Sequence, residues 1–513
     1  MNSRNLAITC FGSVIALHFS GASADECAKL SGLKLPHTEI TSAQSVAAGA
    51  FKPPVGAGQG GPGAGPGDYS RLPPFCRVAG TLRPTPDSDI RFEVWLPESG
   101  WNGKFVGVGN GVWAGSITHF AMAEPLQMGY ATAATDDGHQ GNPLDASFAA
   151  GHPEKLVDFG HRALHETTLA AKAAIAAYYG KKASRSLFVS CSTGGRQGLM
   201  EAHRYPNDYD GISSMAPANP MVGLMVSSLW TGHAALKDVA SRIPPPKFTV
   251  AHNAAVEACD ADDGVKDGII SAPDRCRFDA ATLQCKGSDQ NDCLTAPQVA
   301  AVRAIYEGPR NPRTGTQIYP GFSPGSESMF PIQTTGPEPF AVSTTYMKSL
   351  VFKDANWDFN SFDYDKDITR AMQVGSAAVD VPPNGLGSFF AGGGKLLLSH
   401  GWADGLIPSL STVNFYSELS ARLGPEKTAE SARLFMIPGM GHCAGGAGPF
   451  VFDAISTLDK WVESGHAPDR IVVSNPPGAL ARTRPLCPWP QEATYSGQGS
   501  TDEEKNFTCA ARR

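Results

Sequence analysis

Two dipeptides of this chain each place a cysteine beside a residue that can take part in acyl-transfer chemistry: Cys191-Ser192 and His442-Cys443. A serine hydroxyl is a weak nucleophile, so it needs a neighbouring base to remove its proton. If the two cysteines form a disulfide, a covalent link holds the serine and the histidine close together. We therefore predict that Ser192 and His442 belong to one active site, although they are far apart in the sequence.

The residues around Ser192 predict a sharp turn from a strand into a helix. Residues 186–190 are typical of a buried strand, and residues 196–205 follow as a helix. Such a turn needs small residues on both sides of the nucleophile, as in the pattern G-x-S-x-G. Gly194 meets this requirement, whereas Ser190 takes the place of the first glycine. The alternative is a serine that only caps a helix.

A carboxylate and the histidine follow two further apolar strands. Asp404 comes just after residues 395–400, and His442 comes after residues 434–438. A residue just past a buried strand lies at the carboxyl edge of the sheet, where the sites of α/β proteins form. The order serine, aspartate, histidine is that of α/β-hydrolases. We therefore predict a triad with Ser192; the alternative for His442 is a structural or exposed histidine in a glycine-rich loop.

The surrounding elements predict an α/β-hydrolase fold with a large inserted lid. Residues 90–96 alternate between apolar and polar, and further short apolar runs end in glycine turns. The pattern fades within residues 218–390, which are rich in proline and contain an acidic cluster, and it then returns. We predict a catalytic domain of residues 25–217 and 391–513, interrupted by a lid domain of residues 218–390.

The composition indicates a globular protein without nucleic-acid partners. The chain has 513 residues, of which 42% are hydrophobic and 18% charged, values that fit a soluble domain. Its formal net charge is −7, the opposite of the basic footprint that nucleic-acid binding requires.

Residues 1–24 predict a secretory signal peptide. Arg4 supplies the positive start, residues 6–19 the apolar stretch and residues 22–24 the small-residue cleavage site. A membrane anchor is the alternative, but the apolar stretch is shorter than the roughly 20 residues that a spanning helix needs. We therefore predict a secreted or periplasmic protein that has no membrane partner after cleavage.

The eleven cysteines fit this export. Cys10 leaves with the leader, so an even number remains in an oxidising compartment, where disulfides persist. Pairing cannot be fixed from the sequence alone, but local spacing suggests bridges in the insertion and at both chain ends, which leaves the two active-site cysteines as partners. The suggested pairs are Cys27–Cys76, Cys191–Cys443, Cys259–Cys276, Cys285–Cys293 and Cys487–Cys509.

Three segments, residues 191–198, 401–404 and 439–443, together with the leader resemble the tannase and feruloyl esterase family. The combination of Cys-Ser, Asp and His-Cys is highly specific to that family, and the likeness extends over nearly the whole mature chain. The family includes feruloyl esterases, tannases and a terephthalate half-ester hydrolase. The cysteines beside the triad match a disulfide of the family.

The resemblance implies that Ser192 is the nucleophile, His442 the general base and acid, and Asp404 the residue that orients the histidine. Ester hydrolysis would then proceed through an acyl-enzyme. Two backbone N–H groups should bind the developing oxyanion. One is that of Thr193, after the nucleophile; for the second we favour Gly111 over the residue before it.

Residues 259–269 contain a cluster of aspartates. Carboxylates this close repel one another unless water or a cation neutralises them, and Ca²⁺ takes six to eight oxygen ligands. The spacing is not that of an EF-hand, and a solvated acidic turn is the alternative. The resemblance implies a structural Ca²⁺ site in the lid, with Asp262 pointing away. Its ligands would be the side chains of Asp260, Asp263 and Asp267 and the backbone oxygens of Val265 and Ile269.

The predicted substrate is a small ester of an aromatic acid, either hydroxycinnamic or hydroxybenzoic (gallic). A flat phenolic ring fits an apolar pocket with a few polar groups. Lid aromatic residues that could line it, or equally be core, are Trp230, Tyr346, Phe352, Trp357, Phe359 and Phe362.

The alternatives are a terephthalate half-ester hydrolase, a general carboxylesterase or peptidase, and a catalytically silent binding protein. No arginine of residues 310–370 can be assigned to the free carboxylate of a terephthalate half-ester. The intact triad argues against the silent protein. The sequence does not decide the oligomeric state.

Overall fold

A computed structural model describes residues 20–54 and 68–512. Most of the predicted leader, residues 1–19, lies outside the described residues, and residues 20–24 belong to the backbone of helix α1 (Ser20–Lys29). Within the described ranges, no helix combines the length and the apolar character needed to cross a bilayer.

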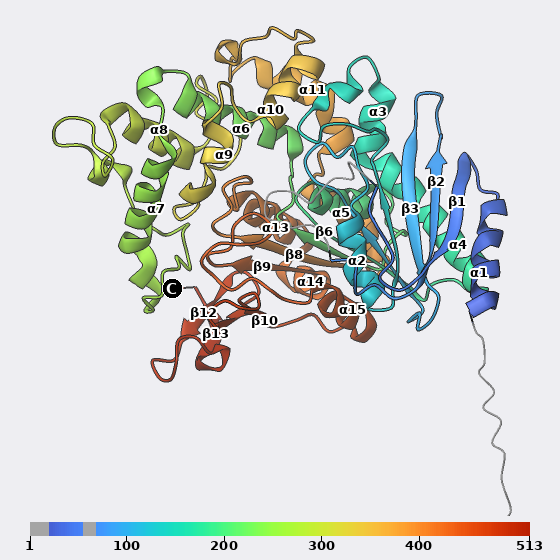
Figure 1. The fold of residues 1–513 in the computed structure, drawn as a ribbon. Coiled ribbons are helices and arrows are strands. Elements are labelled where there is room, and N and C mark those ends of the chain that lie inside the picture. The colour runs from blue at the N-terminus through green and yellow to red at the C-terminus, as the bar shows by residue number, and fades with distance from the viewer. Residues whose placement is uncertain (1–19, 55–67, 513) are drawn as a thin grey trace, which may run out of the picture.

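A nine-stranded mixed sheet runs through the centre of the described chain, in the spatial order β1-β2-β3-β5-β4-β6-β7-β8-β9 (Figure 1). The strands from β5 to β9 pair in parallel, and β1, β2, β3 and β5 pair antiparallel. The strands are β1 (Thr38–Val46), β2 (Phe75–Leu82), β3 (Ile90–Pro97), β4 (Lys104–Val108), β5 (Ala131–Thr135), β6 (Arg185–Cys191), β7 (Gly211–Met215), β8 (Lys395–Gly401) and β9 (Ala432–Ile437).

Helices cover both faces of this sheet, which explains why most residues of its parallel strands are buried. Residues of α4, α5 and α13 pack against one face, and residues of α2 and α15 against the other. Besides α1, the helices outside the insertion are α2 (His119–Gln127), α3 (Pro153–Val157), α4 (Ala163–Tyr179), α5 (Thr193–Arg204), α13 (Leu410–Leu423), α14 (Pro425–Ser431) and α15 (Ala454–Ser464). The fold is thus of the α/β class predicted from the sequence.

Two small hairpins and five disulfides complete the described structure. The hairpins pair β10 (Ile471–Ser474) with β11 (Thr483–Leu486) and β12 (Gln491–Tyr495) with β13 (Phe507–Ala511). Each disulfide joins a pair that the sequence suggested, so those pairings are confirmed.

The chain between β7 and β8, residues 216–394, adds no strand to the central sheet. Residues of α6, α10 and α11 share an apolar cluster with Trp113 and Phe159 of the sheet-forming part, and Figure 1 shows most of the insertion to one side of the sheet. Its division into a separate lid domain stays a prediction. Its helices are α6 (Met221–Leu236), α7 (Pro245–Cys259), α8 (Ala296–Glu307), α9 (Pro331–Thr334), α10 (Ala341–Tyr346), α11 (Asp367–Val379) and α12 (Gly387–Ala391).

One side chain joins the start of this insertion to its end. The buried Asn219 amide donates to the Val381 carbonyl at 3.0 Å and accepts from the Val381 N–H at 2.8 Å. The paired bonds satisfy both polar groups of a buried amide, which would otherwise carry a desolvation cost. The entry and the exit of the insertion are therefore held side by side.

Candidate active site

Ser192 occupies a strained turn between β6 and α5. Its φ of +63° is rare for a residue with a side chain and is typical of functional turns. A Cβ on Gly194 would overlap the Ser190 hydroxyl, and one on Gly195 would lie 2.5 Å from the Met215 carbonyl. The turn therefore accepts a serine at position 190 because the residue facing it is glycine, which explains the departure from G-x-S-x-G.

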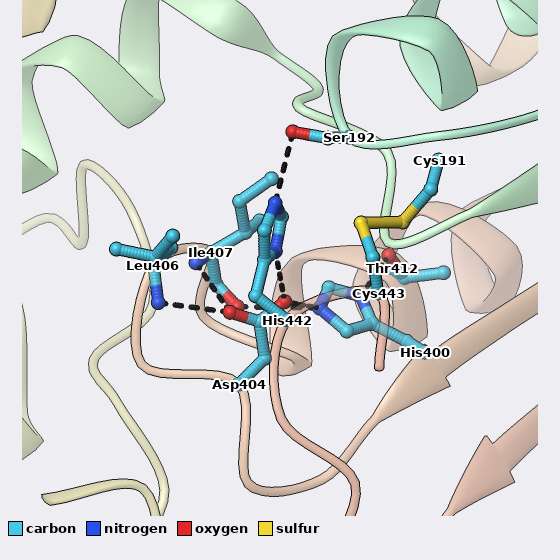
Figure 2. The surroundings of a disulfide bond; sticks show 9 residues. All are labelled: Cys191, Ser192, His400, Asp404, Leu406, Ile407, Thr412, His442 and Cys443. Carbon is cyan, nitrogen blue, oxygen red and sulfur yellow. Dashed lines mark hydrogen bonds and ion pairs between the residues drawn. A yellow bond between two sulfur atoms is a disulfide. The ribbon is translucent and has the colours of Figure 1, made fainter. Parts of the chain in front are cut away.

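The structure brings the three predicted triad residues into one hydrogen-bonded chain (Figure 2). The Ser192 Oγ lies 3.0 Å from His442 Nε2, and His442 Nδ1 lies 2.7 Å from Asp404 Oδ2. The other carboxylate oxygen, Oδ1, accepts from the N–H groups of Leu406 at 2.8 Å and Ile407 at 2.9 Å. This is the arrangement in which a histidine can remove the serine proton while the carboxylate fixes its tautomer.

Asp404 is wholly buried, yet its surroundings favour the charged form. Burial alone would raise the pKa of this carboxyl group. The charge of His442 and hydrogen bonds from His400 and His442 outweigh that effect and hold the pKa well below its usual range. Asp404 is therefore ionised at neutral pH and can stabilise an imidazolium on His442.

The disulfide Cys191–Cys443 ties the end of β6 to the loop that follows β9, with its Cα atoms 6.0 Å apart. The two cysteines are 252 residues apart in the sequence, and their bridge lies directly beside the serine and the histidine (Figure 2). This covalent link limits the relative displacement of Ser192 and His442. Such a restraint matters wherever catalytic geometry tolerates little error.

The loop after β4 is fastened to the start of α5. The Asn110 carbonyl accepts from the Gly194 N–H at 2.8 Å, and the Val112 carbonyl accepts from the Thr193 hydroxyl at 2.7 Å. Gly111 lies between these two anchors, and a Cβ built on it would meet no atom within 4 Å. The backbone N–H groups of Thr193 and Gly111 are thus held in neighbouring segments; their role as oxyanion donors stays a prediction.

Gln197 supports the same loop, a role that the sequence did not predict. Its Oε1 accepts from the Asn110 N–H at 2.9 Å, and its Nε2 donates to Asp137 Oδ2 at 2.7 Å. The position of Gln197 one helical turn beyond the nucleophile was the available signal, but its partners come from two other strand ends. Such long-range contacts do not show in a local pattern.

A cavity of about 330 Å³ reaches His442 from the insertion side. Part of its wall comes from the catalytic loops, including Trp402 and Ala403, and part from the insertion, including Ile269 and Met329. The insertion therefore contributes directly to the surroundings of the histidine.

The lid aromatic residues named from the sequence are not among the described walls of this cavity. They pack against other side chains of the insertion or against the sheet-forming part instead: Tyr346 stacks on Trp113 at 5.7 Å, and Phe352 stacks on Trp357 at 4.6 Å. Their aromatic character serves the core of the insertion.

Two carboxylates of the acidic loop, those of Asp263 and Asp267, help to line a small cavity of about 30 Å³ together with Ile269. Asp260 turns inward and accepts from the N–H groups of residues 267–269, whereas Asp262 is exposed, as expected. Burial raises the pKa of both Asp263 and Asp267; neighbouring carboxylates add to this effect, whereas Arg484 and Arg482 partly offset it at Asp267.

These residues fit a hard cation, because a Ca²⁺ ion would neutralise carboxylates that now repel each other. The cavity also exceeds the roughly 10–15 Å³ that a single water-sized occupant requires. Two features compete. Arg482 and Arg484 both form ion pairs with Asp267, and the Asp260 carboxylate already accepts from the backbone N–H groups of residues 267–269. A cation would have to share both carboxylates with these partners.

The mixed sheet with helices on both faces defines an α/β fold, and Ser192, His442 and Asp404 form one hydrogen-bonded chain at its strand ends. The model of the family "Tannase and feruloyl esterase" matches residues 76–510. The chain therefore belongs to the tannase and feruloyl esterase family, as the sequence resemblance indicated, and it is a carboxylic ester hydrolase.

Individual relatives agree with this assignment. An uncharacterised esterase of Xanthomonas campestris pv. campestris is 36% identical, with 99% of this chain and 95% of the relative covered. The mono(2-hydroxyethyl) terephthalate hydrolase of Piscinibacter sakaiensis is 33% identical over 86% of this chain and 85% of its own length. The crystal structure of feruloyl esterase B from Aspergillus oryzae superimposes with a TM-score of 0.86 at 28% identity, covering 95% of this chain and 100% of that one.

Proposed function

We propose that this protein is an exported serine esterase that hydrolyses esters of hydroxycinnamic or hydroxybenzoic (gallic) acids. The observation that carries the catalytic part is the chain of hydrogen bonds from Ser192 through His442 to the buried, ionised Asp404. The family and its feruloyl esterase structure support the aromatic acid.

In the acylation step, the Ser192 oxygen attacks the ester carbonyl while His442 Nε2 takes the hydroxyl proton. Asp404 stabilises the resulting imidazolium without accepting its proton. The negative oxygen of the tetrahedral intermediate is bound by the N–H groups of Thr193 and Gly111. Collapse of the intermediate expels the alcohol, which takes the proton from His442 and leaves an acyl-enzyme.

In the deacylation step, water occupies the position of the alcohol and gives a proton to His442 as its oxygen attacks the acyl carbonyl. The second tetrahedral intermediate breaks down to the free acid, and the proton returns to the Ser192 oxygen. Each oxyanion donor contributes substantially, since the loss of one such donor costs about 10²–10³ in kcat.

Two alternatives concern the acid that is released. The terephthalate half-ester hydrolase among the relatives favours that substrate, which carries a free carboxylate. The arginines of residues 310–370 are engaged elsewhere: Arg313 pairs with Asp365, and Arg370 lies over the Phe352 ring. Arg310, Arg313 and Arg370 are not among the described residues that line the cavity at His442, which favours a phenolic acid without a second carboxylate. A general carboxylesterase is the second alternative.

A direct comparison of esters tests the substrate class. We expect methyl ferulate or methyl gallate to be hydrolysed with a higher kcat/KM than p-nitrophenyl butyrate or mono(2-hydroxyethyl) terephthalate. A preference for the butyrate would contradict the aromatic specificity. Absence of labelling by a fluorophosphonate, with no hydrolysis of any ester, would instead indicate a silent binding protein.

We also propose that the acidic loop binds one structural Ca²⁺ ion through Asp260, Asp263 and Asp267 and the backbone oxygens of Val265 and Ile269. The ion would neutralise the three carboxylates and lies outside the hydrogen-bonded triad. Metal analysis of dialysed protein tests this proposal: about one equivalent of calcium per chain is expected, and none after Asp263→Asn.

Export follows from the predicted leader together with the five disulfides, which persist in oxidising compartments. We therefore propose a secreted or periplasmic location. Mass measurement of the protein recovered from the expression host tests this, because cleavage after Ala24 removes the first 24 residues.

A further inference from the structure

A second histidine contacts the carboxylate of the triad. His400 lies on β8, four residues before Asp404, and its side chain is wholly buried. Its Nε2 lies 3.1 Å from Asp404 Oδ2, the same oxygen that accepts from His442, and its Nδ1 lies 2.7 Å from the Thr412 hydroxyl. Figure 2 shows the two imidazole rings approaching one carboxylate from different directions.

The neighbours of His400 define where its proton lies. Nε2 faces two acceptors, Asp404 Oδ2 and the Ile407 carbonyl at 3.2 Å, so this nitrogen carries a proton. The Thr412 hydroxyl can then donate to Nδ1. Both ring nitrogens then have a hydrogen-bond partner.

His400 completes the set of hydrogen bonds to Asp404. Oδ1 accepts from the N–H groups of Leu406 and Ile407, and Oδ2 accepts from the two imidazoles. Hydrogen bonds to a carboxylate stabilise its charged form. The bond from His400 therefore orients the carboxylate and also takes up part of the charge on the oxygen that faces His442.

We propose that His400, held by Thr412, is a positioning residue that fixes the Asp404 carboxylate and limits how strongly it attracts the proton of His442. The inference rests on the proposed roles of the triad. Without His400, Oδ2 carries more unshared charge, so it stabilises the imidazolium of free enzyme more strongly. His442 then holds its proton at a higher pH, and the carboxylate is free to tilt away from the reactive geometry.

Other titratable groups face this pair from the insertion. His252 lines the cavity that reaches His442, and Glu327 lies 3.2 Å from its ring. The buried phenol of Tyr319, whose pKa burial raises, senses the charge of Asp404. These groups are the same in every variant below, so differences between the variants report on His400.

The test compares four variants with the wild type. His400→Leu removes the donor, and His400→Gln keeps an N–H near the place of Nε2. Thr412→Val removes the hydroxyl that fixes the tautomer. Ser399→Ala is the matched control, because Ser399 is the buried neighbour on β8 whose side chain points to the opposite face of the strand. Each variant is measured for its thermal midpoint and for the pH profiles of kcat and kcat/KM.

For His400→Leu we expect kcat to fall roughly 10- to 100-fold, as for other misplaced catalytic groups, with KM changed less than about threefold. The acidic limb of kcat/KM should move to higher pH. His400→Gln should recover most of both effects, Thr412→Val should show them more weakly, and Ser399→Ala should match the wild type.

A wild-type kcat and acidic limb in folded His400→Leu would overturn the inference, as would a Gln variant no better than the Leu variant. If His400→Leu does not fold, the inference is overturned by a Thr412→Val protein whose kcat and acidic limb of kcat/KM equal those of the wild type. Failure of the proposed triad looks different: Ser192→Ala would then keep its activity while the wild type hydrolyses the same ester.

Discussion

The triad and the acidic loop each depend on aspartate carboxylates removed from solvent, but they are assembled in different ways. The triad takes its residues from the ends of three strands, β6, β8 and β9, and a disulfide of 252 residues separation links two of them. The acidic loop lies within residues 259–269, and its bridge to Cys276 spans only 17 residues. The first site depends on the whole sheet, whereas the second gathers its carboxylates in one segment and pairs Asp267 with Arg482 and Arg484.

This difference predicts whether substitutions at each site affect activity or stability first. Asp404 already has four hydrogen-bond donors that stabilise its charge, so its pKa is lowered, and its removal affects chemistry first. Asp263 and Asp267 are partly buried with raised pKa values, so their removal or loss of the cation should affect stability first.

The largest effect is expected for Ser192→Ala. Loss of the nucleophile should lower kcat by at least about 10⁴-fold on any ester, by analogy with other serine hydrolases. The thermal midpoint should stay close to that of the wild type. Ser190→Ala, which alters the neighbouring serine of the same turn, should remain active. Comparable residual activity in the two variants would contradict the role of Ser192.

Asp404→Asn should lower kcat about 10⁴-fold, because the histidine loses its orienting carboxylate. The pKa of Asp404 is lowered in the folded protein, so its ionised form stabilises the fold above the ordinary aspartate pKa of about 3.9. That contribution is lost as the pH falls through the lowered folded-state pKa. Urea unfolding should therefore show the largest difference from the wild type at neutral pH, and a difference that grows in acid would refute this.

The double variant Cys191→Ala/Cys443→Ala should lower kcat by about 10²-fold, since roughly 1 Å of displacement between the reacting groups has that effect. Its thermal midpoint should fall by only a few degrees. The pair Cys285→Ala/Cys293→Ala in the insertion is the control and should leave kcat unchanged. Equal relative losses of turnover and stability in the first variant would reduce its bridge to ordinary scaffolding.

The smallest effect on chemistry is expected for the acidic loop. Chelation of calcium, or Asp263→Asn, should lower the thermal midpoint because a ligand bound only by the folded state stabilises it. At room temperature kcat should change less than about twofold. Asp262→Asn, at the exposed position of the same loop, should match the wild type. A loss of kcat without a lower midpoint would argue against a structural role.

The central strands could be predicted because parallel strands covered on both faces are uniformly apolar. Residues 186–190 and 395–400 fall within β6 and β8, and 434–438 overlaps β9. The sequence did not predict a strand at residues 38–46, because β1 lies at the edge of the sheet and is largely half-exposed. Glycine turns and strand ends were enough to place the triad.

The supporting residues of the site could not be predicted in this way. For His400 the sequence pattern predicts only a place in a buried strand. Its contact with Asp404 depends on the conformation of the turn between them. Gln197 reads as one face of a helix, but its partners Asn110 and Asp137 follow β4 and β5. The periodicity of apolar residues predicts which side chains are buried. It does not predict which distant polar group a buried side chain contacts.

The paired bonds between Asn219 and Val381 hold the two junctions of the insertion side by side. An exchange of the polypeptide between these residues would therefore preserve its anchor points. Chimeras joined at residues 219 and 381 should take on the substrate selectivity of the relative that supplies the insertion. Their kcat should stay close to that of the protein that supplies the sheet.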